Sequence, residues 1–318
     1  MSTSNTSLTA ASQPFKGILV MLSATLLFAG HDVLSKYLSG FYPVMLVIWV
    51  RYLVHTLLMM GIFLPQSGLR VLRTKRPGLQ VLRALCLLGT SMLFVTALQY
   101  IPLAEATAVN FLAPLLVTAL SVPLLKENVS TGQWIAVLVG FCGVMVIVHP
   151  GGELFTPAIL LPFCSALCFA IYQLLTRLVA RVDSPTTSNF FAGIFNTLLM
   201  SAIVPFYWQW PTFWHGVLMV ALGGCGMSAH LFLTQAFRHA PPAVLAPFGY
   251  AQIVFAGILG YLIFDHTPSV TAQVGITVIC ASGIAAAWLQ RRASRAMVRP
   301  DPAPAPYVAP SGTASSGQ

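Results

Sequence analysis

Four ionisable side chains lie inside long apolar stretches of this 318-residue chain or at their ends: Asp32, Lys36, Arg51 and Glu105. An ionisable group in hydrocarbon is costly unless it is paired or hydrated, so such residues mark candidate ion or substrate pathways. Lys36 lies near a predicted helix end, where its long side chain reaches the membrane interface. The other three are the strongest candidates for binding a charged group of a solute, or a proton.

Asp32 and Arg51 fall in two consecutive apolar segments that are expected to form an antiparallel pair of helices. Asp32 lies roughly 7 Å and Arg51 roughly 12 Å from the same end, at about 1.5 Å per residue. An ion pair between them is therefore within reach, with Lys36 as a second partner for Asp32. Either this pair only holds the two helices together, or one member faces a cavity and binds a charged group or a proton.

Glu105 follows Pro102 by three residues, at the start of the fourth apolar segment. A carboxylate near a helix N-terminus is stabilised by about 0.3–1 kcal/mol, so capping is the alternative to a role in binding. Pro114 removes one backbone hydrogen bond in the same segment. We expect a bend there toward a cavity lined by Thr107 and Asn110, because irregular backbone at membrane depth is tolerated only where it is buried in protein or lines a water-filled cavity.

A later apolar segment, residues 243–263, is interrupted in a similar way, by the sequence Pro247 to Gln252. Residues 105–125 and 243–263 correspond to each other at an offset of 139 residues. In a membrane protein built from two repeated halves, interruptions at corresponding positions point to the binding site of a transporter. Asn110, Pro114, Tyr250 and Gln252 are therefore predicted to lie near a substrate path. Five further polar residues are weaker candidates, since such groups more often form hydrogen bonds between helices: His31, Tyr172, Gln173, His230 and Gln235.

Composition identifies the elements that must position these residues. Hydrophobic residues make up 57% of the chain and charged residues 7%, whereas soluble domains carry about 25% charged residues. So few charges cannot cover a water-exposed surface, and a multi-pass all-α integral membrane protein is expected. A transmembrane helix needs about 20 apolar residues, which predicts ten spans: 16–36, 44–64, 81–99, 105–125, 132–149, 158–177, 188–206, 216–237, 243–263 and 271–289.

The two halves of the chain repeat one another. Residues 97–104 (ALQYIPLA) match residues 236–243 (AFRHAPPA) at an offset of 139 residues. Phe28-Ala29 likewise matches Phe169-Ala170 at an offset of 141. Ten spans in two copies give five spans a copy, and an odd number makes the second copy enter the membrane from the opposite side. An inverted repeat is typical of transporters that bind their substrate between the halves.

Charge placement predicts the orientation. If the N-terminus is cytoplasmic, 14 of the 16 Lys and Arg residues lie on the cytoplasmic side. The positive-inside rule therefore places both termini in the cytoplasm, and explains the net charge of +9 without nucleic acid. The expected domains are a disordered tail over 1–14, two five-helix repeats over 15–149 and 157–290, and a disordered basic, Pro- and Ala-rich tail over 291–318.

The sequence offers no pattern for a metal, a cofactor or catalysis. Cys164 and Cys168 are four residues apart on one predicted helix, but no further ligand completes a set with metal-like spacing, and packing explains them. The chain has no G-x-x-x-x-G-K-[ST], H-E-x-x-H or G-x-S-x-G motif. We therefore expect neither an ATP-driven pump nor an enzyme, and no cofactor.

Several segments resemble the drug/metabolite transporter superfamily, in its ten-helix members with two EamA-type domains. They are 82–85 (LRAL), 97–114 (ALQYIPLAEATAVNFLAP), 124–144 (LLKENVSTGQWIAVLVGFCGV) and Val50-Arg51-Tyr52, and looser copies lie at 235–248 and 275–284. The resemblance covers about residues 15–290. The second copy departs from the pattern, since Val244 stands where the first has Glu105, so a substrate site must be asymmetric.

The resemblance implies a secondary transporter of a small polar or amphipathic metabolite that works by alternating access. By analogy we lean toward export of amino acids or other metabolites; the alternative is a cofactor-type carrier for riboflavin or S-adenosylmethionine uptake. A passive channel and an intramembrane enzyme are weaker rivals. The expected surroundings are the lipid bilayer, in a bacterial inner membrane, and a small-molecule substrate. This interpretation leaves room for proton or ion coupling and for a homodimer.

Overall fold

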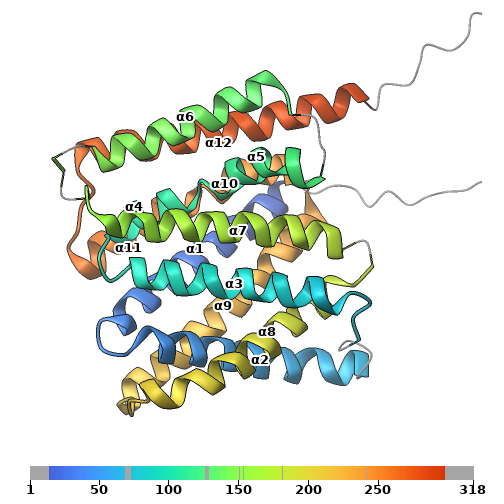
Figure 1. The fold of residues 1–318 in the computed structure, drawn as a ribbon, viewed down its shortest axis with the longest axis vertical. Helices are drawn as coiled ribbons and strands as arrows, with labels where there is room; N and C mark the ends of the chain where they lie inside the picture. The colour runs from blue at the N-terminus through green and yellow to red at the C-terminus, as the bar shows by residue number, and fades with distance from the viewer. Residues whose placement is uncertain are drawn as a thin grey trace, which may run out of the picture.

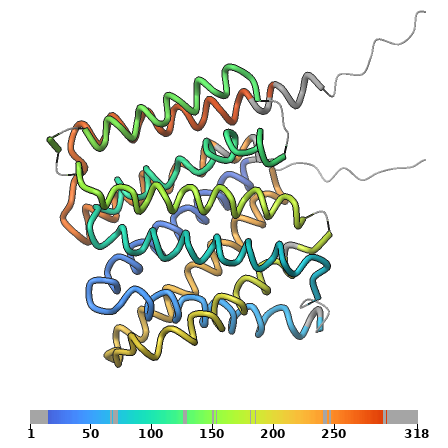
Figure 2. Tube along the Cα trace, in the orientation of Figure 1, coloured from blue at the N-terminus to red at the C-terminus, as the bar shows by residue number. Residues whose placement is uncertain are grey.

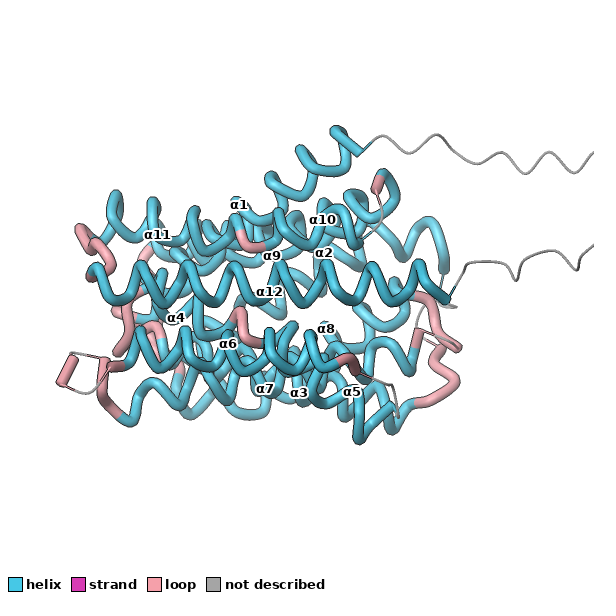
Figure 3. Tube along the Cα trace, turned by 90° about the horizontal axis from the view of Figure 1, so that it is seen from above, coloured by secondary structure: helices cyan, strands magenta, loops and turns pink. Residues whose placement is uncertain are grey.

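The computed structural model describes residues 14–68, 73–125, 129–149, 151–152, 154–180, 182–240 and 242–297. These residues form a bundle of helices that run between its two ends, with α1 and α9 inclined to the others, and contain no strand (Figures 1 and 3). The α-helices are α1 (Pro14–Ser39), α2 (Val44–Ser67), α3 (Pro77–Ala97), α4 (Leu103–Asn110), α5 (Ala113–Leu125), α6 (Thr131–Val148), α7 (Leu160–Val179), α8 (Pro185–Ile203), α9 (Phe213–His239), α10 (Pro242–Gly249), α11 (Ala251–Phe264) and α12 (Val270–Met297). Short 3₁₀ turns at Pro157–Ile159 and Val204–Tyr207 adjoin α7 and α8.

Ten membrane-length apolar spans lie in the described part of the chain, which confirms the predicted number. We call the end of the bundle where α1 begins and α12 ends the terminal end, and the opposite end the distal end. The last helix is longer than expected, because α12 continues to Met297 and includes residues 291–297 that the sequence assigned to the tail. The rest of the two predicted tails, 1–13 and 298–318, lies outside the described residues.

Two of the ten spans are broken near their middle. The span Leu103–Leu125 consists of α4 and α5, with Phe111 and Leu112 between them. Pro114 lies in the first turn of α5, where a proline is tolerated but cannot donate to the carbonyl four residues earlier. The corresponding span of the second half consists of α10 and α11, with Tyr250 between them, after Pro247 and Gly249. Phe111 and Tyr250 differ by the same 139 residues as the sequence repeat, so the breaks correspond.

The halves interlock rather than lying side by side. Helix α1 packs along α9, and α3 packs along α7. In the sequence repeat, α1 corresponds to α7, and α3 corresponds to α9. The α1–α9 and α3–α7 contacts are therefore equivalent to each other. In Figure 2 the teal α3 and the yellow-green α7 lie next to each other although they are far apart in sequence. Every candidate residue in the interior is therefore surrounded by helices of both repeats.

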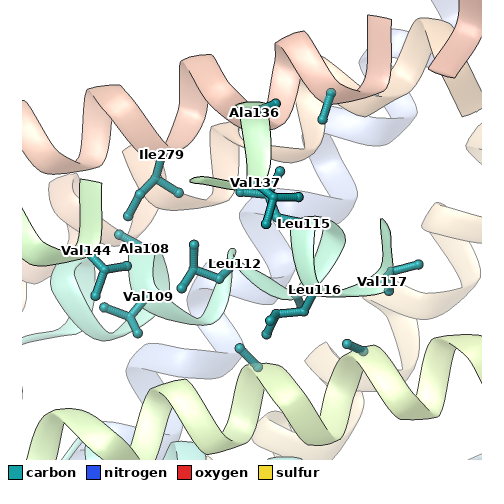
Figure 4. Packing of buried hydrophobic residues seen from close by; sticks show 14 of the residues in the cluster. Ala108, Val109, Leu112, Leu115, Leu116, Val117, Ala136, Val137, Val144 and Ile279 are labelled. Carbon is teal, nitrogen blue, oxygen red and sulfur yellow. The ribbon is translucent and has the colours of Figure 1, made fainter. Parts of the chain in front are cut away.

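Helices α6 and α12 form a pair along one edge of the bundle (Figure 1). Gly143 and Gly275 let their backbones come very close: a Cβ atom at Gly275 would lie 2.5 Å from the carbonyl oxygen of Gly143. Small residues at such contacts are what membrane helices use for tight packing. Below the pair lies the largest apolar core, where side chains of α4, α5, α6 and α12 interdigitate, among them Leu112, Leu115 and Ile279 (Figure 4).

We expect Gly275→Ala to destabilise the protein by about 1–3 kcal/mol, because the added methyl group overlaps backbone that cannot move independently. The matched control is Gly61→Ala in α2, where an added Cβ meets nothing within 4 Å. Thermal unfolding of the purified protein in detergent measures both. Equal melting temperatures for Gly275→Ala and the unaltered protein would contradict the tight α6–α12 contact.

Candidate functional site

A cavity of about 480 Å³ lies between the two repeats, in the size range of small-molecule sites. Both broken spans, as well as α1, α2, α3, α7, α8, α9 and α12, contribute to its wall. Ten of the twelve residues proposed from sequence line this cavity: His31, Asp32, Arg51, Asn110, Pro114, Tyr172, Gln173, His230, Tyr250 and Gln252.

The carboxylate of Asp32 is the acidic group of the cavity wall. Its Oδ1 atom is 3.0 Å from Nδ1 of His31, and its Oδ2 atom accepts a hydrogen bond of 2.9 Å from Nε2 of Gln252. Asp32 belongs to the first repeat and Gln252 to the second, so this contact joins the halves at the cavity. Gly226 leaves room for the His31 ring, since a Cβ at residue 226 would lie 3.2 Å from Cδ2 of His31.

The predicted ion pair between Asp32 and Arg51 is not among the contacts of the described residues. Nη1 of Arg51 instead donates to Oγ of Ser91 at 3.1 Å, and its guanidinium lies 5.2 Å from the centre of the Tyr52 ring. Lys36 is not a partner of Asp32 either, since its Nζ donates to the carbonyls of Leu98 and Ile101 at 2.6 and 3.0 Å. The expectation was wrong because Asp32 reaches Gln252 of α11, Arg51 reaches Ser91 of α3, and Lys36 reaches the connection between α3 and α4.

Helix breaks and aromatic rings meet at the cavity. The rings of Phe111 and Tyr250, the residues between the broken helices, are 5.3 Å apart. Asn110 at the end of α4 accepts a 3.0 Å hydrogen bond from Ser165 of α7. The Tyr250 hydroxyl is buried without a hydrogen-bond partner. Thr107, which was expected beside Asn110, is buried instead and donates to the carbonyl of Leu103 in its own helix.

Arg83 is a buried charge that sequence reasoning missed, although it was noted as part of a family segment. In the predicted span 81–99 it is the third residue, close enough to the cytoplasmic end to be counted with the basic residues of that side, but α3 begins at Pro77, so Arg83 lies a further turn inside the helix and is buried. Its guanidinium donates to Thr176, the carbonyl of Ser188 and the hydroxyl of Tyr172, at 2.7–2.8 Å. Because Tyr172 lines the cavity, Arg83 stands directly behind the cavity wall.

Polar contacts join the repeats at the terminal end. Asp183, between α7 and α8, accepts hydrogen bonds from the Thr74 hydroxyl, the Lys75 backbone N–H and Nε2 of Gln80. Gln80 also donates to Ser188. These contacts connect the start of α3 to the α7–α8 loop. Burial alone would raise the pKa of Asp183, but the three hydrogen bonds outweigh it and hold that pKa below its usual value.

Other contacts join the repeats at the distal end. Glu105 in the first turn of α4 is 2% exposed, and its Oε1 atom lies 3.2 Å from Nε2 of His266. His266 belongs to the loop between α11 and α12. Tyr42, in the loop before α2, lies with its hydroxyl 2.8 Å from Nδ1 of His215 and accepts a hydrogen bond from the Thr212 backbone N–H. Glu105 is therefore not part of the cavity wall, but of a separate contact between the repeats.

Gln235 does not line the cavity, because its side chain is exposed on the outer face of α9. The sequence could not distinguish it from His230, which lies five residues earlier and faces inward. His55 is not among the candidates from sequence, but it lines the cavity, with its ring centre 6.3 Å from that of His230. No group of three or more metal-ligating side chains occurs among the described residues.

Asp183→Asn should lower the free energy of unfolding by about 1–3 kcal/mol at neutral pH, because it removes charge-assisted hydrogen bonds. A carboxyl with a lowered pKa stabilises the fold above the pKa of the unfolded chain and loses this effect as pH falls through its folded pKa. The difference in melting temperature between wild type and variant should thus stay constant from pH 8 to 5 and shrink below about pH 4. A difference that vanishes already at pH 6 would contradict this assignment.

Comparison with known proteins identifies relatives of the whole bundle. The EamA-like transporter family matches the chain twice, over residues 15–149 and 156–287. An S-adenosylmethionine uptake transporter of Rickettsia prowazekii (strain Madrid E) is 28% identical over 263 residues, 83% of this chain and 89% of the relative. A riboflavin transporter of Vibrio cholerae is 29% identical over 276 residues, 85% and 92% of the two chains.

A solved structure shares the fold. It superposes with a TM-score of 0.62 at 23% identity, over 87% of this chain and 98% of the other. The two matched segments each contain five of the ten membrane spans, in agreement with the repeat that the sequence and the paired helix breaks show. The chain is a multi-pass integral membrane protein and belongs to the EamA-like transporter family.

Proposed function

We propose that this protein is a secondary transporter that takes up S-adenosylmethionine, or a closely similar nucleoside-type cofactor, across a bacterial inner membrane. The observation that carries the proposal is the cavity between the repeats, which combines one carboxylate, one guanidinium and several aromatic rings. The sequence alone favoured export of amino acids or other metabolites. The relatives and the composition of the cavity favour the cofactor-type alternative.

Asp32 and Arg51 supply opposite charges on the cavity wall. S-adenosylmethionine carries a sulfonium and an ammonium group together with a carboxylate. A carboxylate in the wall attracts the two cationic groups, and a guanidinium is suited to bind a carboxylate. Asp32 is held by His31 and Gln252, so its oxygens are already oriented before a substrate arrives. A neutral flavin would use neither charge.

Aromatic side chains supply the second requirement. The cavity is lined by rings from several helices: Phe28, Phe94, Phe111, Phe169, Phe237 and Tyr250. Stacking on such rings stabilises a planar purine, and a cation placed over a ring face is attracted by its quadrupole. Phe111 and Tyr250 lie at the two helix breaks, where a small movement of either half changes the shape of the cavity.

Transport would proceed by alternating access. The repeats, residues 15–149 and 157–290, would rock around the cavity, as broken helices at corresponding positions suggest. The contacts of Asp183 and Arg83 at the terminal end, and of Glu105 and Tyr42 at the distal end, would open in turn. With the terminal end in the cytoplasm, as the positive-inside rule predicts, the distal end would receive the substrate. Movement of one elementary charge through 100 mV supplies about 2.3 kcal/mol.

Uptake into proteoliposomes tests this function. We expect saturable accumulation of radiolabelled S-adenosylmethionine, accelerated by unlabelled substrate on the opposite side of the membrane. Asp32→Asn should weaken apparent affinity about 10- to 100-fold, because a hydrogen bond to a charged group contributes about 1.5–3 kcal/mol. The control is Asp265→Asn, which alters an exposed acid in the distal loop and should leave uptake unchanged.

The outcomes separate the possible cargoes. If the protein takes up riboflavin saturably but not S-adenosylmethionine, and Asp32→Asn has no effect on this uptake, the proposed cargo is wrong. The proposal that the protein is a carrier would still hold. Uptake that never saturates and shows no counterflow would indicate a channel and contradict a carrier altogether.

A further inference from the structure

Arg83 is a fully buried cation within the third membrane span, with 1% of its surface exposed. Its guanidinium donates five-fold less to acids than its charge would suggest: none of its printed partners among the described residues is a carboxylate. Those partners are neutral oxygen atoms, namely Thr176 Oγ1, the Ser188 carbonyl, the Tyr172 hydroxyl and, at 3.3 Å, Oδ1 of Asn189. A buried cation without an anionic partner is costly, so Arg83 is a candidate for a role in binding.

Two of these acceptors, Tyr172 and Asn189, line the cavity. A guanidinium has hydrogen-bond donors only, so whatever bonds to it must accept. The hydroxyl oxygen of Tyr172 accepts from Arg83, and its hydrogen is therefore directed away from the guanidinium. Asn189 likewise turns its amide oxygen to Arg83, which leaves the two N–H groups of Nδ2 as donors. Neither the Tyr172 hydrogen nor Nδ2 has an acceptor among the hydrogen bonds of the described residues.

The guanidinium also holds the Tyr172 ring, since it lies 4.6 Å from the ring centre. A cation over an aromatic face is attracted by the ring quadrupole, which adds to the hydrogen bond. Thr176 accepts from Nε of Arg83 and donates to the backbone carbonyl of Tyr172, one turn earlier in α7. The orientation of Tyr172 at the cavity is therefore fixed from behind.

Arg51 adds further donors to the same part of the cavity wall. Its Nη1 atom bonds to Ser91, while Nε and Nη2 have no hydrogen-bond partner among the described residues. Tyr52 lies within electrostatic range of both Arg51 and Tyr172, and His230 within range of both Arg51 and Arg83. We call Arg51, Tyr172 and Asn189 the donor subsite. It combines hydrogen-bond donors from α2, α7 and α8 with positive charge, so it is suited to an anionic acceptor.

Asp32 determines which anion the donor subsite can accept. Its carboxylate bonds to Gln252 of α11 and to His31, on which Arg51 also acts electrostatically. A negative group thus borders the donor subsite and disfavours a multiply charged anion such as a phosphate. A carboxylate next to an ammonium group fits better, because the ammonium is attracted by Asp32 while the carboxylate meets the donors. This is the charge arrangement of an amino-acid group.

We propose that Arg51, Tyr172 and Asn189 bind the carboxylate of the cargo, and that Arg83 is the positioning residue that turns the donors of Tyr172 and Asn189 into the cavity. The inference deepens the proposed function and rests on it, since S-adenosylmethionine carries such a carboxylate. Arg83 belongs to the first repeat, whereas Tyr172 and Asn189 belong to the second. Separation of α3 from α7 and α8 would therefore dismantle the donor subsite and release the carboxylate at the terminal end.

Equilibrium binding to the purified full chain in detergent tests this with two pairs of ligands. S-adenosylmethionine is compared with its decarboxylated analogue, and L-phenylalanine with L-phenylalaninamide, so each pair differs at the carboxylate. Wild type should bind S-adenosylmethionine about 10- to 100-fold more tightly than the analogue, the range expected for hydrogen bonds to a charged group. The phenylalanine pair shows whether the donor subsite takes a carboxylate from a different class of cargo.

Two variants remove single donors from the subsite. Tyr172→Phe keeps the ring and removes the hydroxyl, and Asn189→Asp keeps an acceptor for Arg83 but places an oxygen where Nδ2 stood. Each should weaken binding of S-adenosylmethionine about 10-fold or more and leave binding of the decarboxylated analogue unchanged or tighter. The matched control is Tyr261→Phe, which removes a hydroxyl from an exposed ring of α11 and should change neither affinity.

Arg83→Lys tests the positioning role, because it keeps the charge but loses the planar set of donors that holds Tyr172 and Asn189 together. It should reduce the preference for the carboxylate member of a pair. A purely structural Arg83 would instead lower the melting temperature and weaken both members equally, and that result would overturn the positioning role.

The remaining outcomes separate the two proposals. Wild type that binds both members of each pair equally, or Tyr172→Phe and Asn189→Asp variants that keep the wild-type preference, would overturn the donor subsite. Preference within the phenylalanine pair without binding of S-adenosylmethionine would overturn the proposed cargo and support the subsite. Binding of riboflavin alone would overturn both.

Discussion

The rest of the structure depends on one constraint: backbone N–H and C=O groups in hydrocarbon must find partners within the protein. The ten helical spans of the described residues meet this requirement, and the two interruptions are tolerated because they lie inside the bundle, beside each other. The rings of Phe111 and Tyr250, one from each interruption, lie 5.3 Å apart and border the cavity. The irregular backbone is therefore confined to the place where a solute can be accommodated.

The same constraint governs charge. Among the described residues, the buried Asp, Glu and Arg side chains lie at contacts between the repeats or beside the cavity. Asp32 meets Gln252, Arg83 meets Tyr172, and Glu105 meets His266. Polar contacts of this kind join the repeats at both ends of the bundle and at its middle. In the proposed alternating-access cycle, a relative movement of the halves would break and re-form these contacts.

Much of the fold could be predicted from sequence, because lipid exposure forces long apolar segments that are easy to recognise. The number of spans, the repeat and the interruptions at Pro114 and Pro247 all follow from residue type and order. Individual site residues were harder. His230 and Gln235 lie on one helix with similar polarity, but one faces the cavity and the other is exposed. Arg83 was overlooked because its depth depends on where α3 begins, which hydrophobicity alone does not define.

The sequence by itself determined a ten-span membrane protein of two copies, with few charges and two broken spans. Only the tertiary structure decided which partner each charge has. Asp32 and Gln252 are 220 residues apart in the chain, and the expected partner Arg51 turns to Ser91 instead. The physical reason is that composition specifies that a segment is a membrane helix, whereas the rotation of the helix about its axis is set by packing against its neighbours.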